Sequence, residues 1–386
     1  MNARPLFALV AGEVSGDNLG AALMEALSER YPGARFVGIA GPRMRERGME
    51  SLFPIERLSL MGITEVLPRI PELFRLRRRL VRFLLVEQPD VVITIDAPDF
   101  NLPVARRLRR GGLRTVHYVS PTVWAWRQGR VRGIRAAVDL ILPLFPFEAG
   151  FYERHGVPVE CVGHPMADRI PLEVDVAAAR EQLGLSGDAP VLAVLPGSRK
   201  GEVAQVLDDF LEAARLLRRS HPDLRILVAA VDEHRAAQIT ARLDDSGPES
   251  VEVITARSHE VMAAADLVLL SSGTAALEAM LLKKPMVVGY RVGPVTWAIA
   301  SRMVRVPWVS MPNLLAGEEV VPEFLQNDLT PDAVAGALGH WLDHPDTVAV
   351  LRERFMAAHK DLRRDASRSA ATAIARLLEE SEIQQS

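Results

Sequence analysis

The chain has 386 residues, of which 48% are hydrophobic and 25% charged, so it can bury the cores of two to three soluble domains. Its single cysteine, Cys161, excludes an internal disulfide and lies in a predicted strand, which argues against a catalytic thiol. The net charge of −3 divides into +6 for residues 1–170 and −9 for the remainder, so the first part is expected to meet an anionic partner.

The first predicted strand, Leu6–Ala11, is too short for the apolar core of a signal peptide. No apolar run reaches the roughly 18 residues of a membrane span, so we expect a cytoplasmic protein. Aromatic residues make up only 5% and no nucleic-acid motif is visible, so nucleic acid is not expected as a partner. A phospholipid surface and a phosphorylated substrate remain open.

Apolar runs of strand length alternate with helical stretches, which is typical of βαβ units and parallel sheets. We predict an α/β fold with two doubly wound, Rossmann-like domains, whose ligand should lie in the cleft between them, at the carboxyl ends of the strands. The predicted strands are Leu6–Ala11, Arg35–Ile39, Val91–Ile95, Thr115–Val119, Asp139–Leu142 and Val159–Val162, then Val191–Leu195, Arg225–Ala230, Val251–Ile254, Leu267–Leu270 and Met286–Gly289. The Gly-His-Pro turn at 163–165 falls between the two series, so the domains are predicted as 1–168 and 169–345, followed by a helical stretch over 346–386.

A loop over 12–17 follows the first strand and precedes a predicted helix, Asn18–Arg30. Its glycine spacing does not fit the dinucleotide fingerprint, which argues against a nicotinamide enzyme. Gly12 and Gly16 are expected to keep the backbone bare beside a ligand, and Glu13 is a candidate general base. The alternative is that Asp17 caps the helix and Glu13 is a solvated loop charge.

Leucines at helical spacing and a cluster of arginines follow in residues 58–86. A crossover helix with one buried face explains Leu73, Leu76, Leu80 and Leu84. The apolar stretch before it, followed by five arginines, instead favours docking on an anionic membrane. The residues expected to face the membrane are Met61, Ile63, Val66, Leu67, Ile70, Leu73 and Phe74.

Polar and aromatic groups follow the next two strands. Asp96 comes directly after Val91–Ile95 and is the first candidate for a base that deprotonates a hydroxyl, whereas Asp99 or Asn101 is expected to cap the following helix. A metal bound by Asp96 and Asp99 has weak support, because no histidine lies nearby in the sequence. After Thr115–Val119, the adjacent Trp124 and Trp126 could stack on a sugar, line an acyl channel or pack under the loop. Arg127 heads a run of arginines that could meet an acceptor phosphate.

Two loops of the second half suit phosphate groups. Gly197 and Ser198 bring backbone amides close to a ligand, and Arg199 adds a permanent positive charge that matches a diphosphate. The turn with Ser272, Gly273 and Thr274 leads from a buried strand into a helix, whose first amides form an anion site. Glu278 lies one turn further on and could hold two ribose hydroxyls, although the same turn could simply cap a crossover helix. Tyr290 leaves another strand end, and Asn313 either reads the edge of a uracil or is an ordinary turn residue.

Taken together, these motifs resemble the lipid-A-disaccharide synthase family of GT-B glycosyltransferases, in the expected order over most of the chain. The motifs that carry the resemblance are Ala11-Gly-Glu-Val-Ser-Gly-Asp17, Ile95-Asp-Ala-Pro-Asp-Phe-Asn101, Tyr118-Val-Ser-Pro-Thr-Val-Trp-Ala-Trp126, Val162-Gly-His-Pro165, Leu195-Pro-Gly-Ser-Arg199, the turn from Ser272 to Glu278 and Met311-Pro-Asn-Leu-Leu-Ala316.

The resemblance implies an inverting transfer from UDP-2,3-diacylglucosamine to 2,3-diacylglucosamine 1-phosphate (lipid X), giving the β-1,6 disaccharide 1-phosphate and UDP. It implies lipid A biosynthesis in a Gram-negative bacterium, peripheral attachment to the inner face of the inner membrane, and no metal or other cofactor. It also implies that the last helices pack on the first domain, and it leaves a homodimer open. The implied donor residues are Gly197, Ser198, Arg199, Ser272, Gly273, Thr274, Glu278, Tyr290, Asn313, Leu314 and Leu315, and the implied acceptor region is Ser15, Asp17, Trp124, Trp126 and Arg127.

Two other functions stay open from the sequence. Another UDP-sugar enzyme of the same fold, such as an epimerase, would need no lipid-facing surface. A two-domain binding protein would close on its ligand without chemistry and would tolerate a neutral residue at Asp96.

Overall fold

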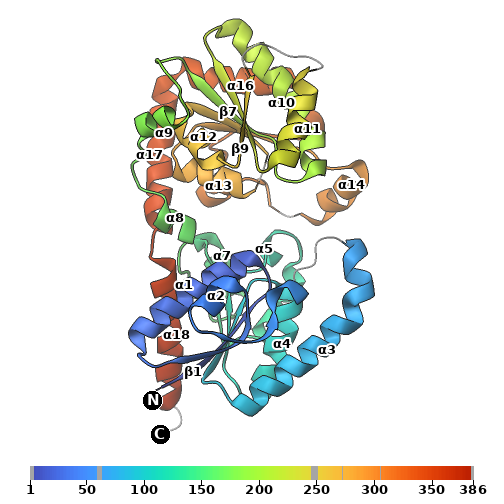
Figure 1. Cartoon of the computed structure of the whole chain (residues 1–386), viewed down its shortest axis with the longest axis vertical. Coiled ribbons are helices and arrows are strands. Elements are labelled where there is room, and N and C mark those ends of the chain that lie inside the picture. Colours follow the sequence, from blue (N-terminus) through green and yellow to red (C-terminus); the bar gives the residue numbers. More distant parts are fainter. Residues whose placement is uncertain (1–3, 59–62, 245–250, 272, 305, 384–386) are drawn as a thin grey trace. The chain divides into compact units, whose positions relative to one another are not determined.

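The computed structural model describes residues 4–58, 63–244, 251–271, 273–304 and 306–383. The chain forms two compact units, which are coloured along the sequence in Figure 1. Unit 1 comprises residues 1–168 and 362–386, and unit 2 comprises residues 169–361. We expected the chain to leave the second domain at residue 346. Helix α17 (Pro345–Leu362) instead belongs to unit 2, where Leu351, Phe355 and His359 are buried.

Unit 1 is built on one parallel sheet in the order β3-β2-β1-β4-β5-β6. The central strands β1 and β4 are apolar and almost entirely buried, because helices cover both faces of the sheet. The strands are β1 (Leu6–Ala11), β2 (Arg35–Ala40), β3 (Glu50–Pro54), β4 (Val91–Ile95), β5 (Thr115–Tyr118) and β6 (Leu140–Leu142).

Two helices pack on each face of this sheet. Helices α1 (Val14–Arg30) and α18 (Ala366–Ile383) share one core with the sheet, and α3 (Ile63–Glu87) and α4 (Pro98–Arg110) share the other, as Figure 1 shows. The shorter helices of this part of the chain are α2 (Pro42–Glu46), η1 (Ile55–Arg57), α5 (Val123–Trp126), η2 (Gln128–Arg130), α6 (Val131–Arg135), α7 (Pro146–Arg154) and α8 (Pro165–Arg169).

Unit 2 repeats the same topology, with the sheet order β12-β11-β10-β7-β8-β9, all parallel. Its strands are β7 (Val191–Leu195), β8 (Arg225–Ala230), β9 (Val251–Thr255), β10 (Leu267–Leu270), β11 (Met286–Tyr290) and β12 (Glu323–Leu325). Its helices, besides α17, are α9 (Val176–Gln182), α10 (Lys200–Ser220), α11 (Glu233–Asp244), α12 (Ser258–Ala264), α13 (Thr274–Leu281), α14 (Pro294–Met303), α15 (Met311–Ala316), η3 (Gln326–Asp328) and α16 (Pro331–Asp343). The α/β prediction with two doubly wound sheets is therefore confirmed.

Several predicted boundaries were wrong. Helix α1 begins at Val14, four residues earlier than expected, so most of the predicted loop is its first turn. The predicted strand Val159–Val162 is reduced to one bridge between Val159 and Ile141, so Cys161 is not in a strand. The edge strands β3 and β12 were not predicted. None of the described helices combines the length and the apolar character needed to cross a bilayer.

Candidate functional site

The strand order of each sheet reverses between its first and fourth strands. In unit 1 this switch point lies between β1 and β4, and in unit 2 it lies between β7 and β10. Doubly wound sheets bind ligands beyond the carboxyl ends of the strands at this point, where the crossover helices diverge to opposite faces. The candidate loops that begin at Gly12 and Asp96 leave β1 and β4, and those that begin at Pro196 and Ser271 leave β7 and β10. The topology thus brings the candidate residues of each unit together.

The two loops of unit 1 touch at Gly12. An ideal Cβ at this position would lie 2.3 Å from the Cβ of Ala97, which leaves no room for a side chain. We expected the bare backbone at Gly12 to face a ligand, but it faces the neighbouring loop. Gly16 is less constrained, because its Cβ would make only ordinary contacts at 3.5 Å or more.

This contact predicts a measurable loss of stability. We expect Gly12→Ala to lower the free energy of unfolding of unit 1 by about 1–3 kcal/mol, because one of the two loops must move. The measurement is the midpoint of denaturant unfolding, followed by circular dichroism. Gly133→Ala is the control, since nothing lies within 4 Å of a Cβ there and alanine favours the helix α6. Equal midpoints for the two variants would contradict the steric argument.

Asp96 occupies a strained turn at the end of β4. Asp96 and Ala97 both have positive φ, at 51° and 43°, a conformation that two successive non-glycine residues adopt only when the surroundings enforce it. Asn101 supplies that constraint, because its Nδ2 donates to the carbonyl oxygens of Asp96 at 2.7 Å and Ile95 at 3.1 Å. Within the part of the chain that the structure describes, the half-buried Asp96 carboxylate makes no hydrogen bond or ion pair. It is therefore available to accept a proton.

The remaining polar residues of the first loop differ in their surroundings. Glu13 is the exposed residue that precedes α1, and Ser15 is exposed in its first turn. Asp17 is only 2% exposed, and its carboxylate accepts hydrogen bonds from the backbone amides of Gly41, Arg43 and Met44. Asp17 thus caps α2 instead of its own helix, and it contributes to an acceptor region only by fixing the loops around it.

The two tryptophans after β5 have different environments. Trp124 is buried, and its Nε1 donates to Glu148 Oε1 at 3.0 Å. Trp126 is 37% exposed, with the Arg127 guanidinium 4.1 Å above its ring. Trp126 and Arg127 can therefore contact a ligand, whereas Trp124 fixes the loop.

The sequence analysis did not include Glu148. Burial raises the pKa of this carboxyl to about 7, although hydrogen bonds from the Phe145 amide and Trp124 oppose the shift. The sequence does contain a signal that points to Glu148. A proline at the first position and a glutamate at the third position are typical of a helix start, here that of α7.

Two loops line one cavity in unit 2, of about 430 Å³. Gly197, Ser198 and Arg199 come from the loop after β7, and Gly273 and Thr274 from the turn after β10. Ser272 lies outside the described residues. Gly197 and Gly273 have φ of 120° and 126°, values that only glycine adopts readily. The first turn of α13, with its free amides, faces the same cavity as Arg199, which is the arrangement of an anion site.

Arg199 is paired with a carboxylate that the sequence analysis missed. Its Nη1 lies 2.8 Å from Glu202 Oε1, and its backbone amide donates to Glu202 Oε2 at 3.2 Å. Both carboxylate oxygens thus hold Arg199 at the start of α10. The Arg199 side chain is still 83% exposed, so the pair is solvated and the guanidinium can reorient toward an anion.

Glu278 lies one turn into α13 and has His259 as its partner. His259 Nδ1 is 2.7 Å from Glu278 Oε1, and the neighbouring Ser258 lines the cavity. The hydrogen bond to Glu278 raises the pKa of His259, against a smaller opposing effect of burial. Among the described residues, the second Glu278 oxygen has no partner, so it remains for a ligand. His259 was not identified from the sequence, because its partner is 19 residues away.

The raised pKa of His259 gives a pH-dependent contribution to stability. A group with a raised native pKa stabilises the fold below its unfolded pKa of about 6.5, and this contribution is lost as the pH rises through the native value. We expect His259→Gln to lower the stability of unit 2 by about 0.2–1 kcal/mol at pH 6, because the pair is partly exposed, and by less at pH 9. Denaturant unfolding at the two pH values measures this. A loss that is larger at pH 9 would have the wrong sign.

Four predicted donor residues lie elsewhere in unit 2. Tyr290 is half-buried at the end of β11, and Leu314 is half-buried in α15. Leu315 lines another hollow, together with residues of α17. Asn313 is fully buried, where Nδ2 donates to Val321 O and Glu323 Oε1, and Oδ1 accepts from the amides of Val320 and Val321. No polar group of Asn313 is left for a uracil, so its role is to hold α15 in place.

The predicted membrane-facing segment is described only in part. Met61 and the side chains of Ile63, Val66, Leu67 and Ile70 lie outside the described residues. Leu73 is half-buried and Phe74 is 49% exposed, whereas Leu76, Leu80 and Leu84 are buried in the core. The prediction of a crossover helix with one buried face is therefore confirmed for Leu76, Leu80 and Leu84. Within the described ranges, no three His, Cys, Asp or Glu side chains gather closely enough to hold a metal ion.

Known proteins match this chain over most of its length. The family model described as lipid-A-disaccharide synthetase matches residues 7–375. The chain is 57% identical to the lipid-A-disaccharide synthase of Alcanivorax borkumensis over 375 residues, covering 97% of this chain and 98% of that protein. It is 53% identical to the Pseudomonas aeruginosa enzyme over 372 residues, covering 96% and 98%.

Solved structures share the fold at much lower identity. UDP-GlcNAc 2-epimerase from Neisseria meningitidis, bound to UDP-GlcNAc, matches with a TM-score of 0.60 at 10% identity, covering 97% of this chain and 99% of the other. The calicheamicin glycosyltransferase CalG4 matches with a TM-score of 0.58 at 15% identity, covering 98% and 99%. At such low identity, these structures show only that the fold is shared. The match to the family model and the identity to the curated relatives show that the chain belongs to the lipid-A-disaccharide synthase family.

Proposed function

We propose that the protein joins two acylated glucosamine units, using UDP-2,3-diacylglucosamine as donor and 2,3-diacylglucosamine 1-phosphate as acceptor. The products are the β-1,6 disaccharide 1-phosphate and UDP. The observation that carries the proposal is that the switch point of each sheet has a group suited to the reaction. In unit 1 it is a carboxylate without a partner among the described residues, and in unit 2 it is a cavity that suits an anion. Membership of the family supplies the substrates.

Asp96 is the proposed base. An inverting transfer needs one group that takes the proton of the acceptor 6-hydroxyl as the oxygen attacks the anomeric carbon. The unpartnered carboxylate at the end of β4 fits this role, and the left-handed turn that Asn101 stabilises fixes its direction. Glu13, exposed at the end of β1, is the second candidate. Ser15, Trp126 and Arg127 are proposed to contact the acceptor.

The cavity of unit 2 is the proposed UDP site. As UDP leaves, negative charge develops on its β-phosphate, and preorganised donors stabilise that charge. Arg199 and the amides at the start of α13 supply these donors, and Gly197, Ser198 and Gly273 line the space that the phosphates would enter. Ser272 stays a predicted contact from the sequence. Glu278 is proposed to hold the ribose through the oxygen that His259 leaves free. Tyr290, Leu314 and Leu315 do not line this cavity, so their contact with the donor stays a prediction from the sequence.

We also propose that the enzyme works at the inner face of the inner membrane, where both acylated substrates reside. The exposed Phe74 and the exposed arginines Arg75, Arg78, Arg79 and Arg82 of α3 favour contact with an anionic lipid surface. The first domain would then receive the acceptor and the second the donor. A homodimer remains part of the proposal to be tested by sedimentation.

The test is release of UDP from UDP-2,3-diacylglucosamine in detergent with a chelator, with and without the acylated glucosamine 1-phosphate. We expect release that depends on the acceptor, together with a disaccharide product. Tight binding of UDP without release would point to another acceptor. Formation of an epimerised UDP-sugar in the absence of an acceptor would replace the proposal by an epimerase.

A further inference from the structure

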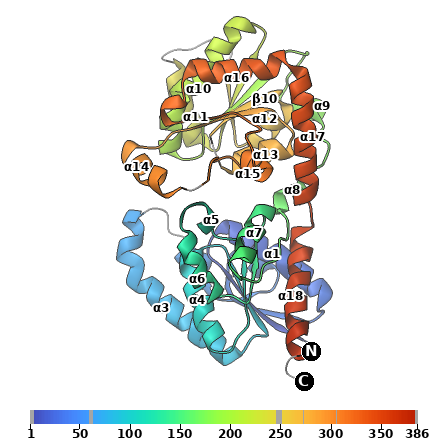
Figure 2. The ribbon, with the colours of Figure 1, turned by 180° about the vertical axis from the view of Figure 1, so that it is seen from behind.

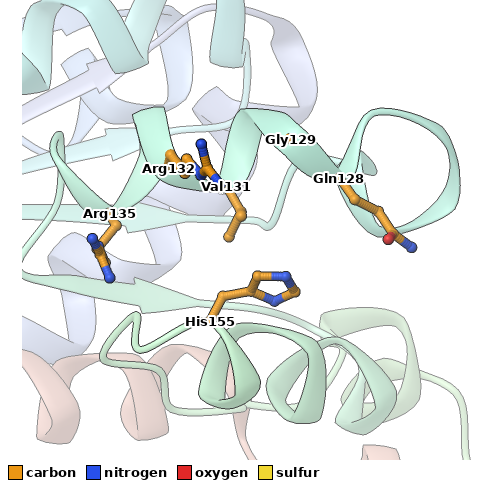
Figure 3. Close-up of a pocket in the computed structure, with 6 residues that line it drawn as sticks. All are labelled: Gln128, Gly129, Val131, Arg132, Arg135 and His155. Atoms are coloured by element: carbon orange, nitrogen blue, oxygen red, sulfur yellow. The ribbon is translucent and has the colours of Figure 1, made fainter.

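A second basic hollow lies at the outer edge of the sheet of unit 1. It has a volume of about 470 Å³ and is lined by Gln128, Gly129, Val131, Arg132, Arg135 and His155. Figure 3 shows the Arg135 guanidinium and the His155 ring extending into the space between α6 and the end of α7, with Arg132 on the same short helix. Within the described residues, no carboxylate lines this hollow. Arg132 and Arg135 give it guanidinium donors that suit an anion.

The charges of this hollow are not neutralised, whereas those of neighbouring arginines are. Arg109 pairs with Asp139 at 2.7 Å, and Arg130 pairs with Asp99 at 2.6 Å. Among the residues that the structure describes, the side chains of Arg132 and Arg135 make no hydrogen bond or ion pair. An ideal Cβ on Gly156 would lie 3.9 Å from Arg135 Nη1, so this guanidinium reaches the segment that follows His155. An anion would relieve the repulsion between these groups.

His155 is oriented by a backbone contact. Its Nδ1 lies 2.8 Å from Phe151 O, and because a carbonyl can only accept, this nitrogen carries a proton. The ring also packs on Phe151, with centroids 4.5 Å apart. Among the described residues, Nε2 of His155 has no hydrogen-bond partner, so it is the ring nitrogen that remains for a ligand. The two permanent charges of Arg132 and Arg135 match the charge of about −1.5 to −2 on a phosphate monoester at pH 7.

We propose that this hollow is a binding site for a phosphate monoester, held by Arg132, Arg135 and His155 and separate from the reaction site. The guanidinium fork matches phosphate oxygens in geometry as well as in charge. A cavity of about 470 Å³ is within the size range of small-ligand sites, so it also has room for the organic group that carries the phosphate.

The position of the hollow separates it from Asp96. It is built beside β6, the outermost strand, and β5 lies between β6 and β4, whose end carries Asp96. Helix α6 leads into the amino end of β6, and α7 starts beyond the carboxyl end of this strand; both helices are labelled in Figure 2. The chain after α7 returns to β6 through the bridge between Val159 and Ile141, so Arg135 and His155 lie away from the switch point. The two sources of such a phosphate are a lipid headgroup and a free phosphorylated metabolite.

The test is a titration followed by the imidazole NMR signals of His155, assigned with His155→Gln. The probes are glucose 1-phosphate and, separately, phosphatidylcholine vesicles that contain phosphatidic acid, with UDP present to occupy the nucleotide site. For at least one probe we expect saturable binding to the parent. We expect affinity about 10–100-fold lower in the double variant R132A/R135A, because both guanidinium contacts to the phosphate are lost from a solvent-accessible site. R132K/R135K should bind with intermediate affinity.

The matched control removes two exposed arginines that also lack ion pairs among the described residues, Arg45 and Arg219, in R45A/R219A. Equal weakening by the control and the double variant would overturn the site, because it would show attraction by net charge alone. Absence of saturable binding to both probes would also overturn it. Binding of glucose 1-phosphate assigns a soluble metabolite as the source, and binding of phosphatidic acid vesicles alone assigns a lipid headgroup.

Discussion

Replacing Asp96 by asparagine is expected to lower kcat by about 10²–10⁴-fold, the usual contribution of a positioned general base. Asparagine has the same shape, and it tolerates the left-handed backbone that Asp96 adopts, so the turn and the fold should persist. The KM for the donor should change little, because the proposed UDP site lies in unit 2. The measurement is the steady-state rate of disaccharide formation with both acylated substrates.

Asp99→Asn is the matched control for this experiment. Asp99 is three residues further on, is 86% exposed and pairs with Arg130 on the surface. Its loss should therefore leave kcat within about twofold of the parent, as for a surface ion pair worth less than 1 kcal/mol. If D96N retained activity within about tenfold of the parent, a loss under about 1.4 kcal/mol of barrier, Asp96 would not be the base and Glu13 would be tested next.

Replacing Arg199 by alanine is expected to lower kcat by about 10²–10³-fold, because a donor aimed at developing charge acts mainly in the transition state. Binding of UDP should weaken as well, since both states carry the diphosphate. Arg199→Lys keeps the charge without the planar fork, and it should recover only part of the rate. Rates measured at saturating donor, together with UDP affinity from calorimetry, separate the two effects.

Two further variants control for the ion pair of Arg199. Arg215 lies on the same helix α10 and pairs with Glu212 at the same spacing, so Arg215→Ala removes an equivalent pair far from the cavity lining. It should keep full activity. Glu202→Gln frees the Arg199 guanidinium but retains an acceptor for the backbone amide, so UDP should bind at least as tightly as to the parent. Weaker binding of UDP by E202Q would show that Arg199 must be held by Glu202.

The central strands were predictable because they are apolar on both faces. Strands β1, β4, β7, β8 and β10 have the predicted bounds, and nearly all of their residues are buried. The strands that were missed, β3 and β12, are at the edges of the sheets, are short and begin with polar residues. An edge strand has one neighbour and one solvated side, so its local composition carries little signal. The order of the strands in each sheet was not predictable from local composition, because it depends on contacts between segments that are distant in the sequence.

Candidate residues were predictable where they lie in a loop between a strand and the following helix. Each of four candidates, Glu13, Asp96, Arg199 and Gly273, lies within a few residues after the end of a buried strand. Parallel strands bring such loops to one edge of a sheet. The partners of these residues were not predictable. Glu278 pairs with His259 and Trp124 with Glu148, across 19 and 24 residues. Only the packing of the intervening helices determines such pairs.

The sequence by itself determined the fold class, the family and the loops that carry the candidate chemistry, because apolar strand runs and local motifs are encoded in consecutive residues. The tertiary structure decided what each polar side chain does. It assigned Asp17 and Asn313 to the support of neighbouring segments, and it gives the Asp96 carboxylate no partner among the described residues. In the same described part of the chain, Arg132 and Arg135 lack the carboxylate partners that Arg109 and Arg130 have. The reason is physical: the partner of a side chain is set by contacts between distant segments, and one sequence does not reveal these before the sheets assemble.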